Sequence, residues 1–410
     1  MGYNATFQTY AISELIDEIA MGPFGSNIKV DCFVDEGIPV FNGSNLTGFT
    51  TNDEELRYVT DEKARSLGRA LASRGDVVVT HRGTLGQIAY IPDDSKYEHY
   101  IISQSQFRMR MNEKALPAYF VYYFHTPLGR WKILSNKAQT GVPALGRPTS
   151  TFQKIEIELP SIDIQSKVVA LLDSLQSAIR LNQRTNDYLA ELLDAQFDNL
   201  IANESTDWET ASLLDIASYK NGLAMQRFRP VGDDPGLPVL KIRELGQGYC
   251  GSDAERCRSD IDESVAIHDG DLVFSWSGTL LLDFWAGGNA GLNQHLFKVT
   301  SDAYPSWFYY MWTKQHMRRF IALAKDRATT MGHIKRSALQ ESEVLIPPAD
   351  DMVELTAEMQ PIVDEIIGLK VQSRKLGELR DILLPKLMSG EIDVSEVELT
   401  TPPNNHLSVG

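Results

Sequence analysis

The stretch GDVVVTHRGT at residues 75–84 returns as GDLVFSWSGT at residues 270–279, 195 positions later. Other matches follow in the same order while the offset drifts by a few residues. They pair GIPV at 37–40 with GLPV at 236–239, Gln104 with Gln294, Phe107 with Phe297, Tyr119-Phe120 with Trp307-Phe308, Leu159-Pro160 with Ile346-Pro347, and LAEL at 189–192 with LGEL at 376–379. A duplication with loop insertions keeps such an order, and chance similarity does not. The sequence therefore predicts two copies of one structural unit.

The composition is that of a globular protein, with 43% hydrophobic and 23% charged residues in a chain of 410. This length suits two or three domains and can bury a large core without disulfides. The three cysteines, Cys32, Cys250 and Cys257, are too scattered for a disulfide framework or a structural zinc site. The first residues lack the basic start and apolar core of a signal peptide, and no window is apolar enough for a membrane helix. We therefore expect a cytoplasmic protein.

Each half follows the same plan of expected elements. Short strands and turns come first, then an aromatic-rich helix, a loop rich in Gly, Thr and Arg, a short strand ending in Pro, and a long helix. The first half has expected strands at 76–80, 87–91 and 106–111, the aromatic helix at 118–134 and the closing strand at 155–160. The second half has the aromatic helix at 306–323 and the closing strand at 343–347.

The long helices give the clearest periodicity, because their apolar residues recur alternately four and three positions apart. The predicted seam consists of Ile164, Val168, Leu171, Leu175, Leu189 and Leu192 in the first helix, and Leu355, Met359, Ile362, Ile366, Leu369, Leu376 and Leu383 in the second. Such a narrow stripe is typical of a coiled coil, and a helix of roughly 35–40 residues spans about 55–60 Å. A core helix inside a globular domain is the alternative. Pro361 interrupts the second pattern, so we expect a kink or a restart there.

These elements predict an α+β fold. We expect two repeat-related globular domains joined by two long helices, which pack as an antiparallel coiled coil with pseudo-twofold symmetry. A ligand with its own twofold symmetry, such as the backbone of duplex DNA, would suit this arrangement. The expected boundaries are 1–161 for the first domain, 162–202 for the central helix, 203–349 for the second domain, 350–393 for the C-terminal helix and 394–410 for an acidic and polar flexible tail.

Positive charge is concentrated in two windows, although the net charge is −16. Residues 125–155 hold five basic residues and no acid, and residues 307–340 hold seven basic residues against one acid. Both windows occupy the same place in the repeat. An acidic chain does not coat nucleic acid non-specifically, but two local basic faces can bind it. A merely solvated face is the alternative for each window.

Most candidate DNA-binding residues lie in these windows and in the turns after the two Gly-Asp strands. Lys, Thr and Ser hold phosphates, whereas Arg and Gln pair with guanine and adenine edges. Since the two turns differ, equal scaffolds would read two different half-sites; for His81 and Trp276, ordinary turn packing is an equal alternative. The candidates are His81, Arg82, Thr84, Lys137, Gln139, Thr140, Arg147 and Thr149 in the first half, and Arg243, Trp276, Ser277, Lys325, Arg327, Thr329, Thr330, His333, Lys335 and Arg336 in the second.

No catalytic motif is present in the sequence. It has no Gly-x-x-x-x-Gly-Lys phosphate loop, no GxGxxG, GxSxG or HExxH, and no Asn/Asp-Pro-Pro-Tyr/Phe motif for amino methylation of bases. The eight histidines show no metal-ligand spacing. Asp94-Ser95-Lys96 matches part of a nuclease pattern, but such triplets are common. We expect a recognition protein without catalytic residues, metal or cofactor of its own.

The segment LLPKLMSGEI at residues 383–392 resembles the signature that closes the second conserved helix in specificity subunits of type I restriction–modification enzymes. GPFGSNIK at 22–29, the two Gly-Asp strands and IELP at 157–160 fit the same family. The resemblance covers roughly residues 10–393. The first long helix ends in AQFDNL at 195–200 and lacks the Leu-Pro-Lys-Leu of the second, a departure that is usual for the family's central helix.

The resemblance implies two target recognition domains, each reading one half of a bipartite, asymmetric DNA sequence. It also implies that the long helices set the distance between the half-sites. From the helix length of about 55–60 Å, with the reading loops inboard of the helix ends, we expect half-site centres about one DNA turn or 34–36 Å apart. Two modification subunits, which bind S-adenosylmethionine and methylate adenine, would dock along these helices, and restriction subunits that use ATP and magnesium would complete the nuclease. A different reading is a two-lobed coiled-coil adaptor that binds acidic peptides or RNA. A third is an enzyme with an unrecognised site between the lobes.

Overall fold

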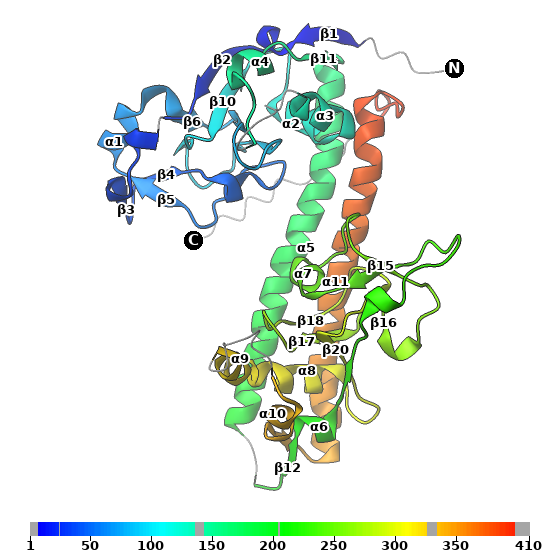
Figure 1. Ribbon diagram of the computed structural model, residues 1–410. Coiled ribbons are helices and arrows are strands. Elements are labelled where there is room, and N and C mark those ends of the chain that lie inside the picture. The colour runs from blue at the N-terminus through cyan, green and yellow to red at the C-terminus, as the bar shows by residue number, and fades with distance from the viewer. Residues whose placement is uncertain (1–6, 24, 136–142, 204–205, 326–333, 398–410) are drawn as a thin grey trace. The chain divides into compact units, whose positions relative to one another are not determined.

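The computed structural model describes residues 7–23, 25–135, 143–203, 206–325 and 334–397. The chain divides into two compact units, here called unit 1 (Met1–Leu175 with Leu379–Gly410) and unit 2 (Gln176–Glu378). Each unit contains part of both long helices, α5 (Ile162–Ala202) and α11 (Ala349–Met388) (Figure 1). In the described ranges no helix is long and apolar enough to cross a membrane.

Unit 1 is a mixed body of sheets and short helices. One antiparallel sheet has the strand order β2-β10-β7-β8, a second has the order β3-β5-β4-β9-β6, and β1 pairs with β11. Its strands are β1 (Gln8–Ala11), β2 (Ile16–Met21), β3 (Phe33–Val34), β4 (Ile38–Val40), β5 (Arg57–Val59), β6 (Leu71–Ser73), β7 (Val77–Thr80), β8 (Ile88–Tyr90), β9 (His99–Ile101), β10 (Gln106–Met111) and β11 (Glu156–Leu159), and its short helices are α1 (Asp61–Ser66), α2 (Pro117–His125), α3 (Pro127–Leu134) and α4 (Pro148–Phe152).

Unit 2 repeats this plan. Its sheets have the orders β13-β20-β17-β18 and β15-β14-β19-β16, and β12 pairs with β21. Its strands are β12 (Glu209–Ser212), β13 (Ser218–Asn221), β14 (Leu237–Leu240), β15 (Arg256–Cys257), β16 (Ala266–Ile267), β17 (Leu272–Ser275), β18 (Leu282–Phe284), β19 (Ala290–Leu292), β20 (Leu296–Thr300) and β21 (Glu343–Ile346), and its short helices are α6 (Leu213–Ile216), α7 (Ile242–Gln247), α8 (Ser306–Gln315), α9 (Met317–Lys325) and α10 (Arg336–Gln340).

The sheet topologies confirm the internal repeat and the α+β class. The order β2-β10-β7-β8 corresponds strand for strand to β13-β20-β17-β18, and the pair β1–β11 corresponds to β12–β21. In the remaining sheets, β4 and β9 run parallel, as do β14 and β19. Unit 1 adds β3 at one edge. The two Gly-Asp strands that reveal the repeat are β7 and β17, which lie inside their sheets.

Strand β7 is buried on both faces, and so is its counterpart β17. Successive side chains on a strand point to opposite faces. Val77 and Val79 accordingly join the core shared with the aromatic helices, while Val78 joins the core of the other sheet. In β17, Phe274 and Val273 divide between two cores in the same way. This double burial accounts for the continuous apolar runs after Gly-Asp, because neither face meets water.

The aromatic helices expected at 118–134 and 306–323 are each two helices, which corrects the sequence prediction. α2 ends before Thr126, whose extended backbone precedes Pro127, because proline disfavours a helical residue before it. The Thr126 Oγ1 then accepts a hydrogen bond from the Gly129 N–H at 3.0 Å and caps α3. In unit 2, α8 and α9 are separated at His316, whose Nε2 lies 2.8 Å from the Glu343 carbonyl oxygen.

Helix α11 runs through Pro361 without the restart that we expected. Proline removes one backbone N–H and so leaves the carbonyl of Ala357 without its helical partner. Both Pro361 and Ala357 are exposed, so water can satisfy that carbonyl.

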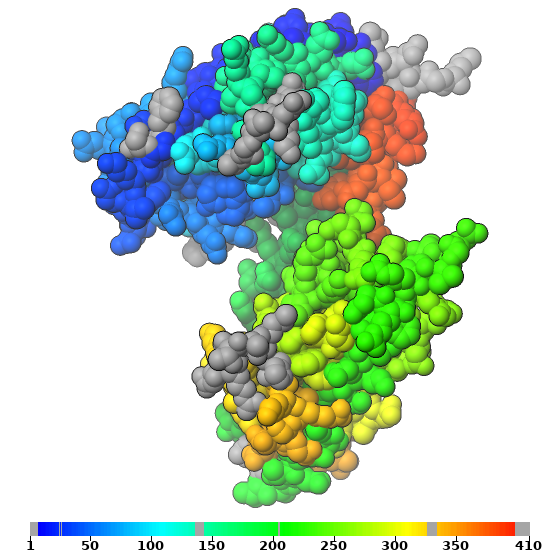
Figure 2. Space-filling view, in the orientation of Figure 1, coloured from blue at the N-terminus to red at the C-terminus, as the bar shows by residue number. Residues whose placement is uncertain are grey.

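The two long helices share a core within each unit. In unit 1, the space-filling view shows the orange-red end of α11 against the teal surface of the α2–α3 region (Figure 2). In unit 2, Asn182 is buried and its Nδ2 donates to Gln372 Oε1 at 2.8 Å. The core residues from the two helices are Val168, Leu172, Leu384 and Leu387 in unit 1, and Leu193, Phe197, Met359 and Val363 in unit 2.

One predicted seam residue is placed wrongly. Leu192 is 46% exposed, whereas its neighbour Leu193 is 1% exposed. Near its C-terminus α5 packs on the aromatic helix α8 as well as on α11, and the ring of Phe197 lies 5.3 Å from that of Trp312. The buried stripe therefore shifts by one residue. The other predicted seam residues are buried or half-buried.

Candidate nucleic-acid interface

In unit 1, the turn after β7 and the loop that begins at residue 143 form one structure. The Leu145 N–H donates to the His81 carbonyl at 2.9 Å, and the Gly83 N–H donates to the Pro143 carbonyl at 2.9 Å. Between these bonds, Arg82 forms an isolated bridge with Ala144. The sequence predicts these two segments as separate candidates for DNA binding. In the structure, backbone hydrogen bonds join them.

Unit 2 builds the same junction. There the Ile334 N–H donates to the Trp276 carbonyl at 3.0 Å, as Leu145 does to His81 in unit 1. On the other side of the turn, the Trp276 N–H reaches the His295 carbonyl at 3.4 Å. Trp276 therefore occupies the place of His81, which is the equivalence that the sequence repeat predicts.

A groove of about 650 Å³ opens beside this junction in unit 1. Three of the predicted DNA-binding residues, His81, Arg82 and Thr149, line it. Arg69 and Gln104 line it too, although the sequence prediction omitted both. The groove therefore combines guanidinium, amide and hydroxyl groups, which suit phosphates and base edges.

His81 forms part of the groove wall and is 9% exposed. Its Nε2 lies 3.2 Å from the Gln104 carbonyl oxygen, and its ring lies 6.4 Å from that of Phe107. Burial lowers the pKa of His81 below its ordinary value, so the ring is neutral at pH 7. It can offer hydrogen bonds there but no positive charge.

The exposed end of this junction is here called the tip of its unit. In unit 1 the charged residues of the tip are Arg82 and Arg147, and both are exposed. Arg147 adopts φ 48° and ψ 63°, a left-handed conformation that is uncommon for a side chain of this kind. It directly precedes the short helix α4, and its carbonyl accepts a bond from the Thr151 N–H at 2.9 Å. Thr84 is exposed as well, and Thr149 is half-buried. These positions leave the arginines open to a ligand.

The tip of unit 2 differs, and two predictions there need correction. Ser277 is 3% exposed, and its Oγ lies 3.0 Å from His295 Nδ1. The sequence could not reveal this contact because the partner is distant in the chain. Arg243 is exposed but forms ion pairs with Glu244 at 2.7 Å and Asp253 at 3.0 Å. Its charge is already compensated, which makes it a poor phosphate ligand.

Further exposed positive charge in unit 2 comes from the residues that flank the basic loop. Lys325 ends α9, and Lys335 and Arg336 stand at the start of α10. Trp276 is half-buried, with its ring 5.7 Å from that of Phe297. The remaining candidates lie outside the described residues: Lys137, Gln139, Thr140, Arg327, Thr329, Thr330 and His333.

Gln104 is the most informative residue that the prediction missed. It is exposed at the mouth of the groove, and in the described part of the chain its side-chain amide makes no hydrogen bond. An amide can pair with adenine through one donor and one acceptor. The sequence contains a sign of this role, because Gln104 matches Gln294 across the repeat. That match was interpreted only as part of the repeat.

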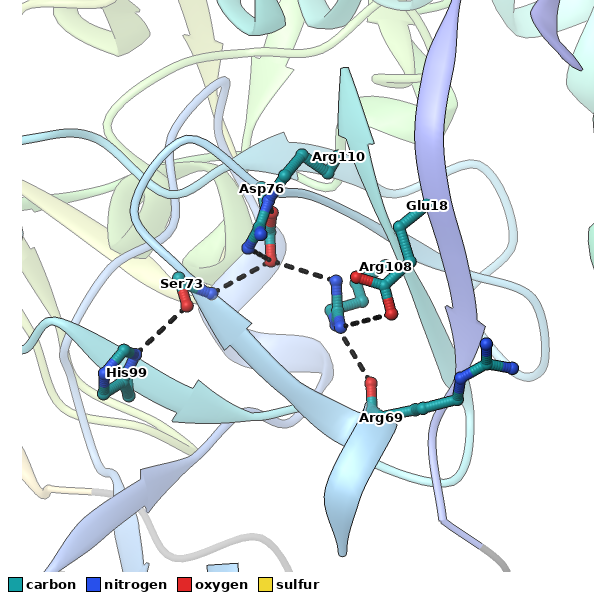
Figure 3. A network of polar contacts seen from close by, with 7 residues as sticks. All are labelled: Glu18, Arg69, Ser73, Asp76, His99, Arg108 and Arg110. Carbon is teal, nitrogen blue, oxygen red and sulfur yellow. Dashed lines mark hydrogen bonds and ion pairs between the residues drawn. The ribbon is translucent and has the colours of Figure 1, made fainter. Parts of the chain in front are cut away.

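A buried ionic network holds β7, the strand that leads to this turn (Figure 3). Asp76 is completely buried and pairs with Arg108 at 3.3 Å and with Arg110 at 3.0 Å. It also accepts from the Ser73 N–H at 3.0 Å, while Arg108 pairs with Glu18 at 3.0 Å. Hydrogen bonding to Asp76 raises the pKa of Arg110. The network fixes where the strand begins and hence where the turn projects.

Unit 2 has a smaller version of this network. Asp271 pairs with Lys298 at 2.9 Å and accepts from the His268 N–H at 2.8 Å. The Gly-Asp signature thus marks a carboxylate that pairs with a cation on the neighbouring strand. Among the described residues, no group of three or more His, Cys, Asp or Glu side chains is placed to hold a metal ion.

Comparison with known proteins shows which family the chain resembles. The type I restriction modification DNA specificity domain matches residues 33–191. The specificity subunit of the type I restriction enzyme MjaIX from Methanocaldococcus jannaschii is 21% identical over 377 residues, covering 83% of each chain. In sequence the chain is thus similar to the specificity subunits of type I restriction–modification enzymes.

A solved structure has the same fold as this chain. The S subunit of a type I restriction-modification system from M. genitalium gives a TM-score of 0.56 at 15% sequence identity, covering 94% of this chain and 97% of that chain. The two chains therefore share a fold. The residues that match the DNA specificity domain, 33–191, include His81, Arg82 and Thr149 of the groove in unit 1.

Proposed function

We propose that this chain is the specificity subunit of a type I restriction–modification enzyme and that it recognises a bipartite, asymmetric sequence in duplex DNA, with unit 1 reading one half-site and unit 2 the other. The observation that supports this most strongly is the repeated junction of a strand, a turn and a basic loop. Both units carry it on the same sheet order, and the residues at its tip differ. Equal scaffolds with unlike tips suit two unlike half-sites.

The long helices would act as the spacer between the half-sites. α5 has 41 residues and α11 has 40, which corresponds to about 60 Å at 1.5 Å per residue. We propose that they pack as an antiparallel coiled coil and that the half-site centres lie about 34–36 Å apart. Insertion of four residues in both helices adds about 6 Å. The spacer should then grow by one or two base pairs, and changed half-sites would contradict this role.

The chemistry would belong to partner subunits. Two modification subunits would dock along the helices and methylate adenine with S-adenosylmethionine. Restriction subunits using ATP and magnesium would complete the nuclease. The chain itself would have no active site and would need no cofactor. Its charge of −16 supports such an assembly, because phosphate neutralisation governs affinity and the partners can supply basic surface.

A binding titration tests this proposal directly. The chain alone should bind its duplex target weakly, and the affinity should fall steeply as salt rises. Addition of modification subunits should give tight, sequence-specific retention that an unrelated duplex does not compete away. Nanomolar binding by the lone chain at moderate salt would contradict the proposal. Equal retention of all duplexes, or of RNA, would favour an adaptor instead.

A further inference from the structure

Unit 1 contains a second cavity, of about 430 Å³, next to the groove. Its size lies in the range of pockets that hold small organic ligands, about 300–1,000 Å³. Its lining combines a set of apolar side chains, here called the floor, with a set of polar side chains, here called the mouth. The floor consists of Ile28, Phe33, Val40 and Phe41, and the mouth of Asn42, Glu55, Arg57, Ser103 and Gln104.

The floor is aromatic and firmly supported. The ring of Phe41 is fully buried and stacks on Tyr100, with the ring centres 4.3 Å apart and the planes 9° apart. Phe33 is half-buried, and the guanidinium of Arg57 lies 5.3 Å from the centre of its ring. A flat, apolar surface of this kind favours a planar ligand over an aliphatic one.

The mouth offers donors and acceptors without net charge. Glu55 and Arg57 carry opposite charges, and neither forms an ion pair within the described part of the chain. The Gln104 amide is likewise without a protein hydrogen bond there. A phosphate would meet the Glu55 carboxylate, so the ligand that fits best is neutral, planar and polar at its edge. A nucleobase has these properties.

The cavity and the groove share part of their lining. Pro23, Gly25 and Gln104 line both. A Cβ atom at Gly25 would lie 2.2 Å from Gln104 Oε1, so glycine leaves the space that this amide occupies. Glu55 adopts φ 48°, a strained backbone conformation of the kind found at ligand clamps. The groove and the cavity therefore adjoin at Gln104.

We propose that this cavity binds a nucleobase, supplied by the duplex in the neighbouring groove and turned out of its stack. The inference rests on the proposed function, because the groove must hold DNA. The base would stack on the half-buried ring of Phe33, and Gln104 would hydrogen-bond to its edge. Bases turned out of a duplex in other DNA-binding proteins are held by stacking and edge contacts of this type.

Fluorescence of 2-aminopurine tests the proposal in the complex with modification subunits. The probe replaces single bases through the mapped target, except the adenines that the modification subunits methylate and turn out themselves, and its emission should rise severalfold at one position of one half-site. Phe33→Ala should abolish that rise and lower affinity about 5- to 150-fold through lost stacking. Val34→Ala is the matched control, since this exposed neighbour on β3 does not line the cavity and should change neither signal. Ile28→Trp, which fills the cavity from a half-buried position, is a second variant with the same expected loss of signal.

The outcomes separate this inference from the proposed function. Sequence-specific binding without a rise at any position, or a rise that survives both Phe33→Ala and Ile28→Trp, would overturn the cavity assignment and leave the proposed function standing. No specific binding by the wild type would overturn the proposed function and the cavity assignment with it. Free adenosine is titrated in parallel without DNA. Binding of adenosine that depends on Phe33, together with no 2-aminopurine signal, would overturn DNA as the source of the base.

Discussion

Units 1 and 2 have the same strand orders but present different groups at the ends of β7 and β17. In unit 1, Arg82 and Arg147 are exposed and His81 lines a groove. In unit 2, Ser277 turns inward to His295, and Trp276 is half-buried against Phe297. The comparison teaches that the scaffold and the tip are set by different residues. Buried residues fix the sheet, so the tip can change without disturbing it.

The supporting carboxylates differ in the same comparison. Asp76 is completely buried among two arginines, whereas Asp271 is 21% exposed and pairs with one lysine. Lys298 also donates to the Ala266 carbonyl at 2.9 Å. Unit 1 therefore depends more strongly on its Gly-Asp signature than unit 2 does.

The largest expected effect is on the stability of unit 1. Asp76→Ala leaves Arg108, which is 5% exposed, with the Glu18 carboxylate and the Arg69 carbonyl, and should lower the free energy of unfolding of unit 1 by about 3 kcal/mol. Asp271→Ala should lower that of unit 2 by less. Hydrogen exchange of peptides from each unit, measured along a urea series, separates the two. Equal losses in both units would contradict the comparison.

The second effect concerns sequence discrimination. Arg82→Ala should relax recognition in one half-site about 5- to 150-fold, since a paired arginine–base contact contributes about 1–3 kcal/mol. Ser277→Ala should leave both half-sites unchanged, because its side chain is buried away from a ligand. Methylation rates on targets with single mismatches, using the assembled complex, measure this. If Arg82→Ala lowered discrimination against mismatches in both half-sites, the two units would not recognise their half-sites independently.

The third effect is a difference in acid sensitivity. Burial lowers the pKa of both His81 and His125 in unit 1. Each must bind a proton on unfolding at low pH, so unit 1 loses stability as pH falls below about 6.5, by at most about 1.4 kcal/mol per pH unit for each histidine. In unit 2, burial lowers the pKa of His316, while hydrogen bonds to Asn289 and Glu263 raise that of His268.

In unit 2 the effects of these opposite pKa shifts on stability partly cancel. Below pH 6.5, a histidine with a raised pKa stabilises the folded unit, and a histidine with a lowered pKa destabilises it. Urea midpoints of the two units at pH 7 and pH 5.5 test the difference. Unit 1 should lose more stability on acidification, and His125→Asn should reduce that loss. A larger loss in unit 2 would mean that the buried histidines do not control the response.

The smallest effect concerns the ties between unit 2 and α11. Arg374 donates to the Ala286 carbonyl at 2.7 Å and pairs with Asp269 at 2.7 Å and Glu378 at 2.9 Å. Arg374→Ala should destabilise unit 2 by about 1 kcal/mol, and Glu378→Gln, which removes only the contact within the helix, by about 0.3 kcal/mol. Urea unfolding followed in unit 2 measures both. An equal effect of the two changes would show that the contacts of Arg374 with Ala286 and Asp269 do not stabilise unit 2.

Periodicity and repetition predict the elements of this fold well, and long-range packing accounts for the errors. The duplicated Gly-Asp strands and the long helices follow from patterns within the sequence. The exposure of Leu192 does not, because it depends on where α5 meets Trp312 of another helix. The break at Thr126 could have been predicted, since Pro127 follows it.

The candidate site was predicted less completely for the same reason. Basic residues at the tips follow from charge and repeat position, as for Arg82 and Arg147. The burial of Ser277 depends on His295, and the compensation of Arg243 depends partly on Asp253, ten residues away. Contacts of this kind are set by the folded sheet and leave no local pattern.

The central claim is that two unlike tips on one duplicated scaffold read two halves of one target. Mapping of methylated adenines in DNA from cells that carry this chain and its modification partner tests it most directly. The account predicts two short, different base runs separated by a spacer of fixed length. A single uninterrupted motif, a palindrome with identical halves, or methylation without any motif would contradict it.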